Sequence, residues 1–209
     1  MLFKSVGFAG KYHKCPEIHC WYKLSPMTRE EAFELLKKHV KKQNLIKHMV
    51  AVGGIMRALA RHFGEDEHRW ELAGLLHDID YEYTNENPEN HPEMGVQILR
   101  DYGFNDEEIL HAILAHNNKA PLETLMDRAL YVSDPTSGFI VAAALIRPEK
   151  SLDAVDVPFL LRRFKEKSFA RGASREQMKM CEELLGLGLE DFYAIALEGM
   201  KEVRQELGL

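Results

Sequence analysis

The sequence predicts an all-α protein: one helical bundle with additional helices at its C-terminal end. From Thr28 onward, apolar residues recur every three or four positions, which is the spacing of one face of a helix. Residues that favour helix ends separate these stretches, beginning with Thr28 and Glu31, which are spaced as a capping box. No stretch has the pattern of a credible strand. We therefore expect helices and no sheet.

We expect two parts in the chain. Residues 1–26 mix Gly, Pro, Cys, His and aromatic residues without a helical period, and are interpreted as an N-terminal extension that is not part of the domain. Residues 27–209 are expected to form one helical domain, with its core at about 44–148 and a helical cap at about 149–209. Within the extension, His13, Cys15, His19 and Cys20 are types that bind zinc, but their spacing matches no closed zinc module and favours a chance cluster.

Composition excludes several classes of protein. The chain has 209 residues, of which 45% are hydrophobic and 29% charged, as in an ordinary globular protein. A formal net charge of −6 argues against general nucleic-acid binding, but it allows a small anionic substrate held by a local positive site. The three cysteines are too few for a disulfide framework, and no apolar run reaches the roughly 18 residues of a membrane span. We predict a cytoplasmic protein without a membrane partner, and the sequence indicates no particular oligomeric state.

Three helices are predicted before the loop around Pro88. The first runs from Thr28 to about Lys42. Asn44 is expected to cap the second, which carries the apolar stripe Leu45, Met49, Val52, Met56, Leu59 and Phe63. Asp66 is expected to open the third, which ends in Leu75-Leu76-His77-Asp78.

Proline, glycine and capping residues bound the later helices. Pro92 would start a helix with His91 as its N-cap, and Gly103 would end it. The other predicted helices are one capped by Asn105 with Glu108 that reaches His116, one from Pro121 to Asp134 that Pro135 interrupts, one over 137–146, one capped by Ser174 with Gln177, and a long one from about Leu189.

Histidines and aspartates recur where these helices end or face inward. His77 and Asp78 bind metals well and fit poorly in a plain apolar core. At about 100° per residue, His48 lies at the edge of the apolar stripe of its helix and should point inward. A lone histidine of this kind is more often a core residue, but His48, His77, Asp78 and Asp134 together offer ligands from separate helices, as metal sites in bundles do.

This order of residues resembles the HD superfamily of metal-dependent phosphohydrolases. The likeness extends over about 44–148 and centres on Leu-Leu-His-Asp-Ile. The resemblance implies that His48, His77, Asp78 and Asp134 are metal ligands, with His77 and Asp78 at the catalytic centre. His91 and His116 would complete a six-ligand version that holds two metals bridged by Asp78.

Position on the helix favours His116 over His111 as a candidate metal ligand. His116 lies within about 20° of Ile109 on the helical wheel, whereas His111 lies about 160° away and is expected to face solvent. Six nitrogen and oxygen ligands without a thiolate favour two divalent ions of iron or manganese, and leave zinc, cobalt and nickel open.

The resemblance implies hydrolysis of a nucleotide or another small phosphate ester by a metal-activated water. Branches that hydrolyse cyclic dinucleotides have Gly-Tyr-Pro where this chain has Asn117-Asn118-Lys119-Ala120-Pro121, so that activity is not expected. Many relatives also have Gly-Lys after His-Asp-Ile, whereas Asp80-Tyr81 follows here.

The sequence indicates substrate-binding residues less clearly than metal ligands. Lys119 follows His116 closely, and Ser137 lies where a phosphate could approach a helix start. Between Arg147 and Lys179, nine Lys or Arg stand against five Asp or Glu, and Lys167 and Arg171 are candidates to bind the substrate anion there. The alternative is a solvated basic face.

Two other functions stay open at this point. Six-ligand HD proteins include di-iron oxygenases, which substrate-dependent oxygen uptake would distinguish from a hydrolase. A non-catalytic regulatory HD module is the other, but such modules tend to lose ligands and this chain keeps all six.

Overall fold

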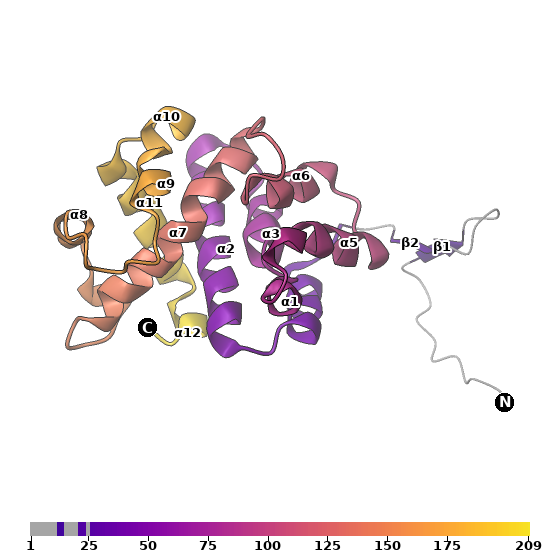
Figure 1. The fold of residues 1–209 in the computed structure, drawn as a ribbon, viewed down its shortest axis with the longest axis horizontal. Helices are drawn as coiled ribbons and strands as arrows, with labels where there is room; N and C mark the ends of the chain where they lie inside the picture. The colour runs from indigo at the N-terminus through magenta and orange to yellow at the C-terminus, as the bar shows by residue number, and fades with distance from the viewer. Residues whose placement is uncertain (1–11, 15–20, 24–25) are drawn as a thin grey trace.

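The computed structural model describes residues 12–14, 21–23 and 26–209. Helices dominate it, as predicted (Figure 1). They are α1 (Arg29–His39), α2 (Gln43–Phe63), α3 (Glu67–Leu76), α4 (Tyr81–Thr84), α5 (Glu93–Asp101), α6 (Glu107–Ala115), α7 (Leu125–Leu145), α8 (Val157–Phe164), α9 (Arg175–Lys179), α10 (Cys181–Leu185), α11 (Leu189–Glu202) and α12 (Arg204–Leu207), with 3₁₀ turns η1 (Pro88–Asn90) and η2 (Leu152–Ala154).

A short hairpin precedes the helices. Strands β1 (Tyr12–Lys14) and β2 (Trp21–Lys23) pair in antiparallel fashion, with His13 opposite Tyr22. The expectation of no strand was therefore wrong in this segment, because three-residue strands are too short to show a two-residue alternation. His13, Cys15, His19 and Cys20 were interpreted as a chance grouping of zinc-binding residue types. Their side chains lie outside the part of the chain that the structure describes, so this stays a prediction. The assignment of 1–26 as an extension stays a prediction.

The two longest helices, α2 and α7, organise the bundle. Figure 1 shows α7 crossing in front of α2, with α1, α3, α5 and α6 on one side of the pair and α8 to α11 on the other. Apolar side chains from Met27 to Leu207 form one core cluster, to which both the helices before Pro148 and those after it contribute. Among the described helices, none is both long and apolar enough to cross a membrane.

Helix starts agree with prediction where a side chain caps them. Thr28 Oγ1 accepts from Glu31 N at 3.2 Å, and Glu31 Oε2 accepts from Thr28 N at 2.9 Å, which is the expected capping box. Asp66 likewise caps α3 by accepting from the next two free backbone N–H groups, those of His68 and Arg69.

Other helix starts are displaced from their predicted residues. Asn44 lies inside α2, whose N-cap is Lys42. The backbone N–H groups of Lys41 and Lys42 donate to Glu82 Oε1 at 2.9 and 2.6 Å, so a residue distant in sequence satisfies this end. Three further starts shift by one to four residues: α5 has Pro92 as its N-cap, α6 has Asp106, and α7 begins after Thr124, which forms a capping box with Asp127.

Pro135 does not interrupt its helix, contrary to prediction. A proline within a helix lacks the N–H that would bond to the carbonyl four residues earlier. That carbonyl belongs to Tyr131, and it accepts from Gln177 Nε2 at 2.7 Å instead. The two helices predicted on either side of Pro135 are therefore one helix, α7, and a side chain of α9 supplies the lost hydrogen bond.

Glycines set the distance between α2 and α3. A Cβ added at Gly74 would lie 2.7 Å from the Cα of Gly53, so the two backbones touch at this point. Gly74 lies three residues before His77. The close approach therefore brings the end of α3, with His77 and Asp78, against the helix that carries His48.

We expect Gly74→Ala to destabilise the protein by about 1–3 kcal/mol, because the added methyl group overpacks a backbone contact. The midpoint of urea unfolding measures the change. Gly138→Ala is the matched control: Gly138 is an exposed helical residue whose added Cβ would meet nothing within 4 Å, so stability should stay the same or rise slightly. Equal stability of both variants would contradict the assigned role of Gly74.

Candidate metal centre

The structure brings together the six residues that the sequence singles out as ligands. His48 comes from α2, His77 and Asp78 follow α3, His91 precedes α5, His116 follows α6, and Asp134 lies in α7. Three overlapping sets of three have donor atoms within 4.8 Å of one another: His48 with His77 and Asp78; Asp78 with His91 and His116; His77 with His116 and Asp134. Donors from five segments thus converge on one point in the bundle.

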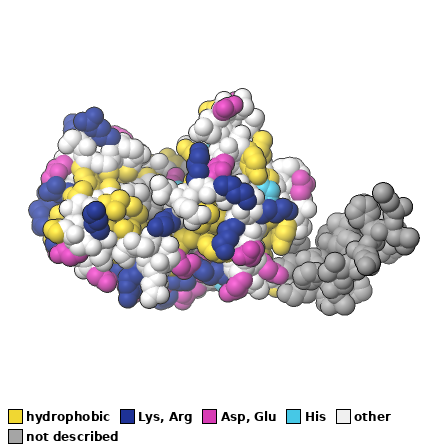
Figure 2. Space-filling view, turned by 90° about the horizontal axis from the view of Figure 1, so that it is seen from below, with side chains coloured by type: hydrophobic (Ala, Val, Ile, Leu, Met, Phe, Trp, Pro, Cys, Tyr) yellow, Lys and Arg dark blue, Asp and Glu magenta, His cyan; other side chains and the backbone are white. Residues whose placement is uncertain are grey.

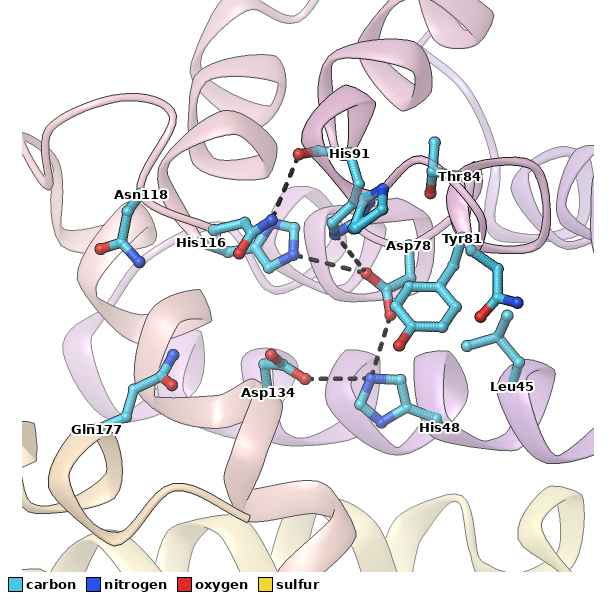
Figure 3. Close-up of a pocket in the computed structure, with 13 residues that line it drawn as sticks. Leu45, His48, Asp78, Tyr81, Thr84, His91, His116, Asn118, Asp134 and Gln177 are labelled. Carbon is cyan, nitrogen blue, oxygen red and sulfur yellow. Dashed lines mark hydrogen bonds and ion pairs between the residues drawn. The ribbon is translucent and has the colours of Figure 1, made fainter. Parts of the chain in front are cut away.

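The Asp78 carboxylate lies at the centre of this cluster. Its Oδ2 is 3.6 Å from His48 Nε2 and 3.5 Å from His77 Nε2. Its Oδ1 faces the other way, 3.3 Å from His91 Nε2 and 3.5 Å from His116 Nε2. Figure 3 shows His91 and His116 on one side of Asp78, and His48 with Asp134 on the other. Each oxygen therefore has its own pair of imidazoles.

Asp134 joins the first of these two groups. Its Oδ1 lies 3.1 Å from His48 Nε2 and 3.9 Å from His77 Nε2. The Nε2 atoms of His48 and His77 are themselves only 3.2 Å apart. Ring nitrogens and carboxylate oxygens that share so small a space are arranged as a cation would require, and the set contains no thiolate.

Each imidazole is oriented by a hydrogen bond at its other nitrogen. Nδ1 of His77 lies 2.8 Å from the carbonyl oxygen of Gly74, and Nδ1 of His116 lies 2.5 Å from that of Ile113. A carbonyl only accepts, so these two Nδ1 atoms carry the hydrogen and leave the Nε2 lone pairs directed at the cluster. Because both histidines follow the last residue of a helix, each reaches a carbonyl three residues back in its own helix.

Asp80 orients His91 and was missed by the sequence analysis. This carboxylate is fully buried; Oδ1 lies 2.9 Å from His91 Nδ1, and Oδ2 accepts from Gly95 N at 3.0 Å. A carboxylate that accepts from a histidine ligand is a recurrent feature of metal sites, where it fixes the ring and raises its basicity. The signal available in the sequence was a second aspartate two residues after Asp78.

Ser137 orients His48. Its hydroxyl donates to the carbonyl of Asp134 at 2.9 Å and is 2.9 Å from His48 Nδ1. Since the hydroxyl proton is used on the carbonyl, Nδ1 of His48 is the donor and Nε2 is free to bind a metal. Ser137 is fully buried. In this position it holds a histidine.

Burial and neighbouring charges shift the pKa values of the cluster. Burial is the main cause that lowers the pKa of His77 to about 4, assisted by the neighbouring His116 and His48, so its ring is neutral at pH 7. Burial would raise the pKa of Asp78, but the nearby His77 and the hydrogen bond from His116 outweigh it and hold the pKa below its usual range. Asp78 therefore stays ionised.

The pKa values of Asp134, His48 and His116 are shifted by the charged groups next to them. Burial opposes ionisation of Asp134, but its hydrogen bond with His48 prevails and lowers its pKa. Burial likewise opposes the charged forms of His48 and His116, but Asp134 and Asp78 respectively raise their pKa values. Two anionic carboxylates thus attract positive charge to the cluster, which a divalent metal supplies.

A cavity of about 540 Å³ opens onto the cluster. Besides five of the six clustered residues, its walls are Leu45, Tyr81, Thr84, Asn85, Pro88, Asn117, Asn118 and Gln177. Among the residues that the structure describes, no Lys or Arg lines it. Side-chain amides and the hydroxyls of Tyr81 and Thr84 are therefore the polar groups that line the cavity beside the clustered residues.

The predicted substrate-binding cations lie elsewhere. Lys119 Nζ donates to the Glu89 carbonyl at 2.6 Å and is 3.7 Å from Glu93 Oε2. Lys167 and Arg171 line a separate cavity of about 680 Å³ beside α9. Their role in substrate binding, and that of Ser137, stays a prediction. His111 contacts Asp127, at 3.1 Å between Nδ1 and Oδ2, and is not part of the cluster.

Comparison with known proteins agrees with the geometry. The sequence model for the HD domain matches residues 45–155, a range that contains all six clustered residues. The symmetrical bis(5′-nucleosyl)-tetraphosphatase of Bacillus subtilis is 29% identical over 150 residues, which cover 62% of this chain and 75% of the relative. No solved structure matches.

Ribonucleases Y match over a shorter region. Those of Oleidesulfovibrio alaskensis and Salinispora arenicola are 31% and 33% identical over 96 residues, or 46% of this chain. The match spans only 18% and 16% of those proteins. The predicted resemblance is confirmed, since the HD-domain match covers more than half of the sequence and contains the whole cluster: this chain belongs to the HD-domain family.

Proposed function

We propose that this protein is a metal-dependent phosphohydrolase that acts on a nucleotide or another small phosphate ester. The observation that carries the proposal is the division of the Asp78 carboxylate between two pairs of imidazoles. Similarity to a bis(5′-nucleosyl)-tetraphosphatase over 75% of that enzyme's length supports hydrolysis of a phosphorylated substrate.

The donor set fits two metal ions. His48, His77, Asp134 and Oδ2 of Asp78 would hold one ion, and His91, His116 and Oδ1 of Asp78 the other. Iron or manganese suits this nitrogen and oxygen set, and zinc, cobalt or nickel would also bind. When bound, the ions activate a water for attack on phosphorus and stabilise the charge on the phosphoryl oxygens.

The residues of the chain prepare this centre in two ways. The Nδ1 hydrogen bonds to Gly74, Ile113, Asp80 and Ser137 hold four rings in orientation before any ligand arrives, which lowers the entropy lost on binding. The amides of Asn85, Asn117, Asn118 and Gln177 line the cavity, where their N–H groups can donate to phosphoryl oxygens. This arrangement would position a phosphate without a Lys or Arg.

A di-iron oxygenase is the second candidate, because four imidazoles and two carboxylates would hold two irons equally well. The experiment that separates the two is an assay of protein reconstituted with Fe²⁺ or Mn²⁺, run in parallel without oxygen and with it. The substrates are nucleoside mono-, di- and triphosphates, bis(5′-nucleosyl) tetraphosphates and simple phosphate esters. We expect phosphate or nucleotide release without oxygen. Substrate-dependent oxygen uptake, a mixed-valent di-iron spectrum and no hydrolysis would overturn the proposal.

Asp78→Ala should abolish both metal binding and hydrolysis, because it removes the carboxylate that both groups of imidazoles share. Metal content of the purified protein, measured by mass spectrometry, and phosphate release are the readouts. Asp191→Ala, at an exposed position of α11, is the control and should leave both unchanged. Full metal content in the Asp78 variant would refute the ligand assignment.

Asp80→Asn should weaken one metal site selectively. An amide has one acceptor, so it cannot accept from both His91 Nδ1 and Gly95 N, as the carboxylate does. Loss of such a partner typically lowers metal affinity about 10- to 100-fold. Titration of metal into the metal-free variant should show a lower affinity for the ion held by His91 and His116. The affinity of the other site should be unchanged. Asp191→Asn serves as the control, and unchanged affinity in the Asp80 variant would remove its positioning role.

A further inference from the structure

A second hollow opens beside the metal cavity, at the start of α2. It measures about 570 Å³ and is lined by Lys42, Gln43, Asn44, Leu45, His48 and Tyr81. Leu45, His48 and Tyr81 also line the metal cavity, so the two spaces meet at these residues. Figure 3 shows the Tyr81 ring and Leu45 next to Asp78 and His48. A ligand at the metal centre can therefore extend into this hollow, which we name the Tyr81 hollow.

Tyr81 presents an aromatic ring to this space. The ring is perpendicular to that of His91, at 82° and 5.7 Å between centroids, and the residue is 47% exposed. Its backbone N–H donates to the carbonyl of Asp78 at 3.0 Å, which ties the residue to the metal-binding turn. An aromatic side chain that is half exposed beside a polar centre offers a surface on which a planar ligand can stack.

The short helix that carries Tyr81 is attached to the segment that connects α1 and α2. Glu82 accepts from the backbone N–H groups of Lys41 and Lys42 at the start of α2. Tyr83 packs edge-on against His39, with centroids 5.9 Å apart. The position of the Tyr81 ring relative to α2 is therefore set by hydrogen bonds to the start of that helix, and the hollow between them is preformed.

The far wall of the hollow is polar and available. Gln43 and Asn44 are exposed, and neither side-chain amide makes a hydrogen bond to any residue in the part of the chain that the structure describes. Each amide offers both donors and an acceptor, the combination that pairs with the edge of a nucleobase. Leu45 adds an apolar surface between them and the metal cavity.

We propose that the Tyr81 hollow binds the base of a nucleotide whose phosphate lies at the metal centre. A nucleobase has the chemistry that this space matches: a flat face for Tyr81 and Leu45, and a polar edge for Gln43 and Asn44. This inference rests on the proposed function and narrows its substrate class from phosphate esters to nucleotides. A sugar phosphate or inorganic polyphosphate would use the metal centre alone.

Binding is tested on metal-loaded protein with ligands that cannot be hydrolysed. The probes are the methylenephosphonate analogues of AMP, GMP, CMP and UMP, in which carbon replaces the ester oxygen, and the same ribose phosphonate without a base. Calorimetric titration gives the affinities. At least one nucleotide analogue should bind ten or more times more tightly than the base-free compound. Equal affinities for all five would overturn the proposal.

Variants assign the preference to Tyr81. Tyr81→Ala should weaken the preferred nucleotide analogue about 5- to 100-fold, the range expected for one lost stacking contact, and leave the base-free compound unaffected. Tyr81→Phe should retain binding, since it keeps the ring. Tyr102→Ala is the matched control, because Tyr102 is 41% exposed, close to the exposure of Tyr81, but lies at the end of α5 and lines a different cavity. An equal loss for the base-free compound in Tyr81→Ala would count against a base subsite.

Because the Tyr81 ring packs against His91, Tyr81→Ala could also disturb the metal centre, and a second variant away from His91 is needed. The double substitution Gln43→Ala, Asn44→Ala removes no hydrogen bond to a clustered residue in the part of the chain that the structure describes, so metal content should be unchanged while the nucleotide preference falls. A retained preference in that variant and in Tyr81→Ala would refute the assignment. These titrations do not depend on turnover, so an absence of hydrolysis with the nucleotide preference intact would overturn the proposed function and leave the base subsite standing.

Discussion

The structure depends on one buried carboxylate, that of Asp78, placed between two pairs of imidazoles. A buried anion needs compensating partners, and here it lies within 3.6 Å of four ring nitrogens that belong to four segments of the chain. The bundle is built so that these segments meet. Gly74 rests on Gly53 and brings α3 against α2, while Pro135 is accommodated within α7 so that Asp134 and Ser137 stay on one continuous helix. The core thus serves to place side chains as well as to exclude water.

The precision of the cluster comes from partners that would never touch a metal. Two carbonyls at helix ends, one buried carboxylate and one buried hydroxyl each engage an Nδ1 atom and direct an Nε2 atom inward. The same turn that ends α3 supplies His77, Asp78, Asp80 and Tyr81 within five residues. It therefore contributes two of the clustered residues, the residue that orients a third, and an aromatic ring that lines the adjoining hollow. Where many relatives have Gly-Lys, this chain has Asp80-Tyr81, and both residues have positions that the structure explains.

The six clustered residues could be predicted from the sequence more readily than the features that orient them. His48, His77 and Asp134 stood out because polar residues on apolar helix faces are conspicuous, and the family pattern joined them. Helix starts were predicted correctly at Thr28 and Asp66, where a side chain performs the capping. They were displaced where a distant residue does so, as Glu82 does for α2, because such a partner has no signature in local sequence. For the same reason the effect of Pro135 was wrongly predicted: its compensating donor, Gln177, comes from another helix.

Whether Asp78 joins two metal ions is tested most directly by a crystal structure of the metal-loaded protein. Anomalous diffraction data collected at the absorption edge of the bound metal locate each ion without reference to the protein model. The account predicts two peaks on opposite sides of the Asp78 carboxylate, one beside Nε2 of His48 and His77 and the other beside Nε2 of His91 and His116. Peaks away from Asp78, or no peak at all in protein that still hydrolyses phosphate esters, would contradict it.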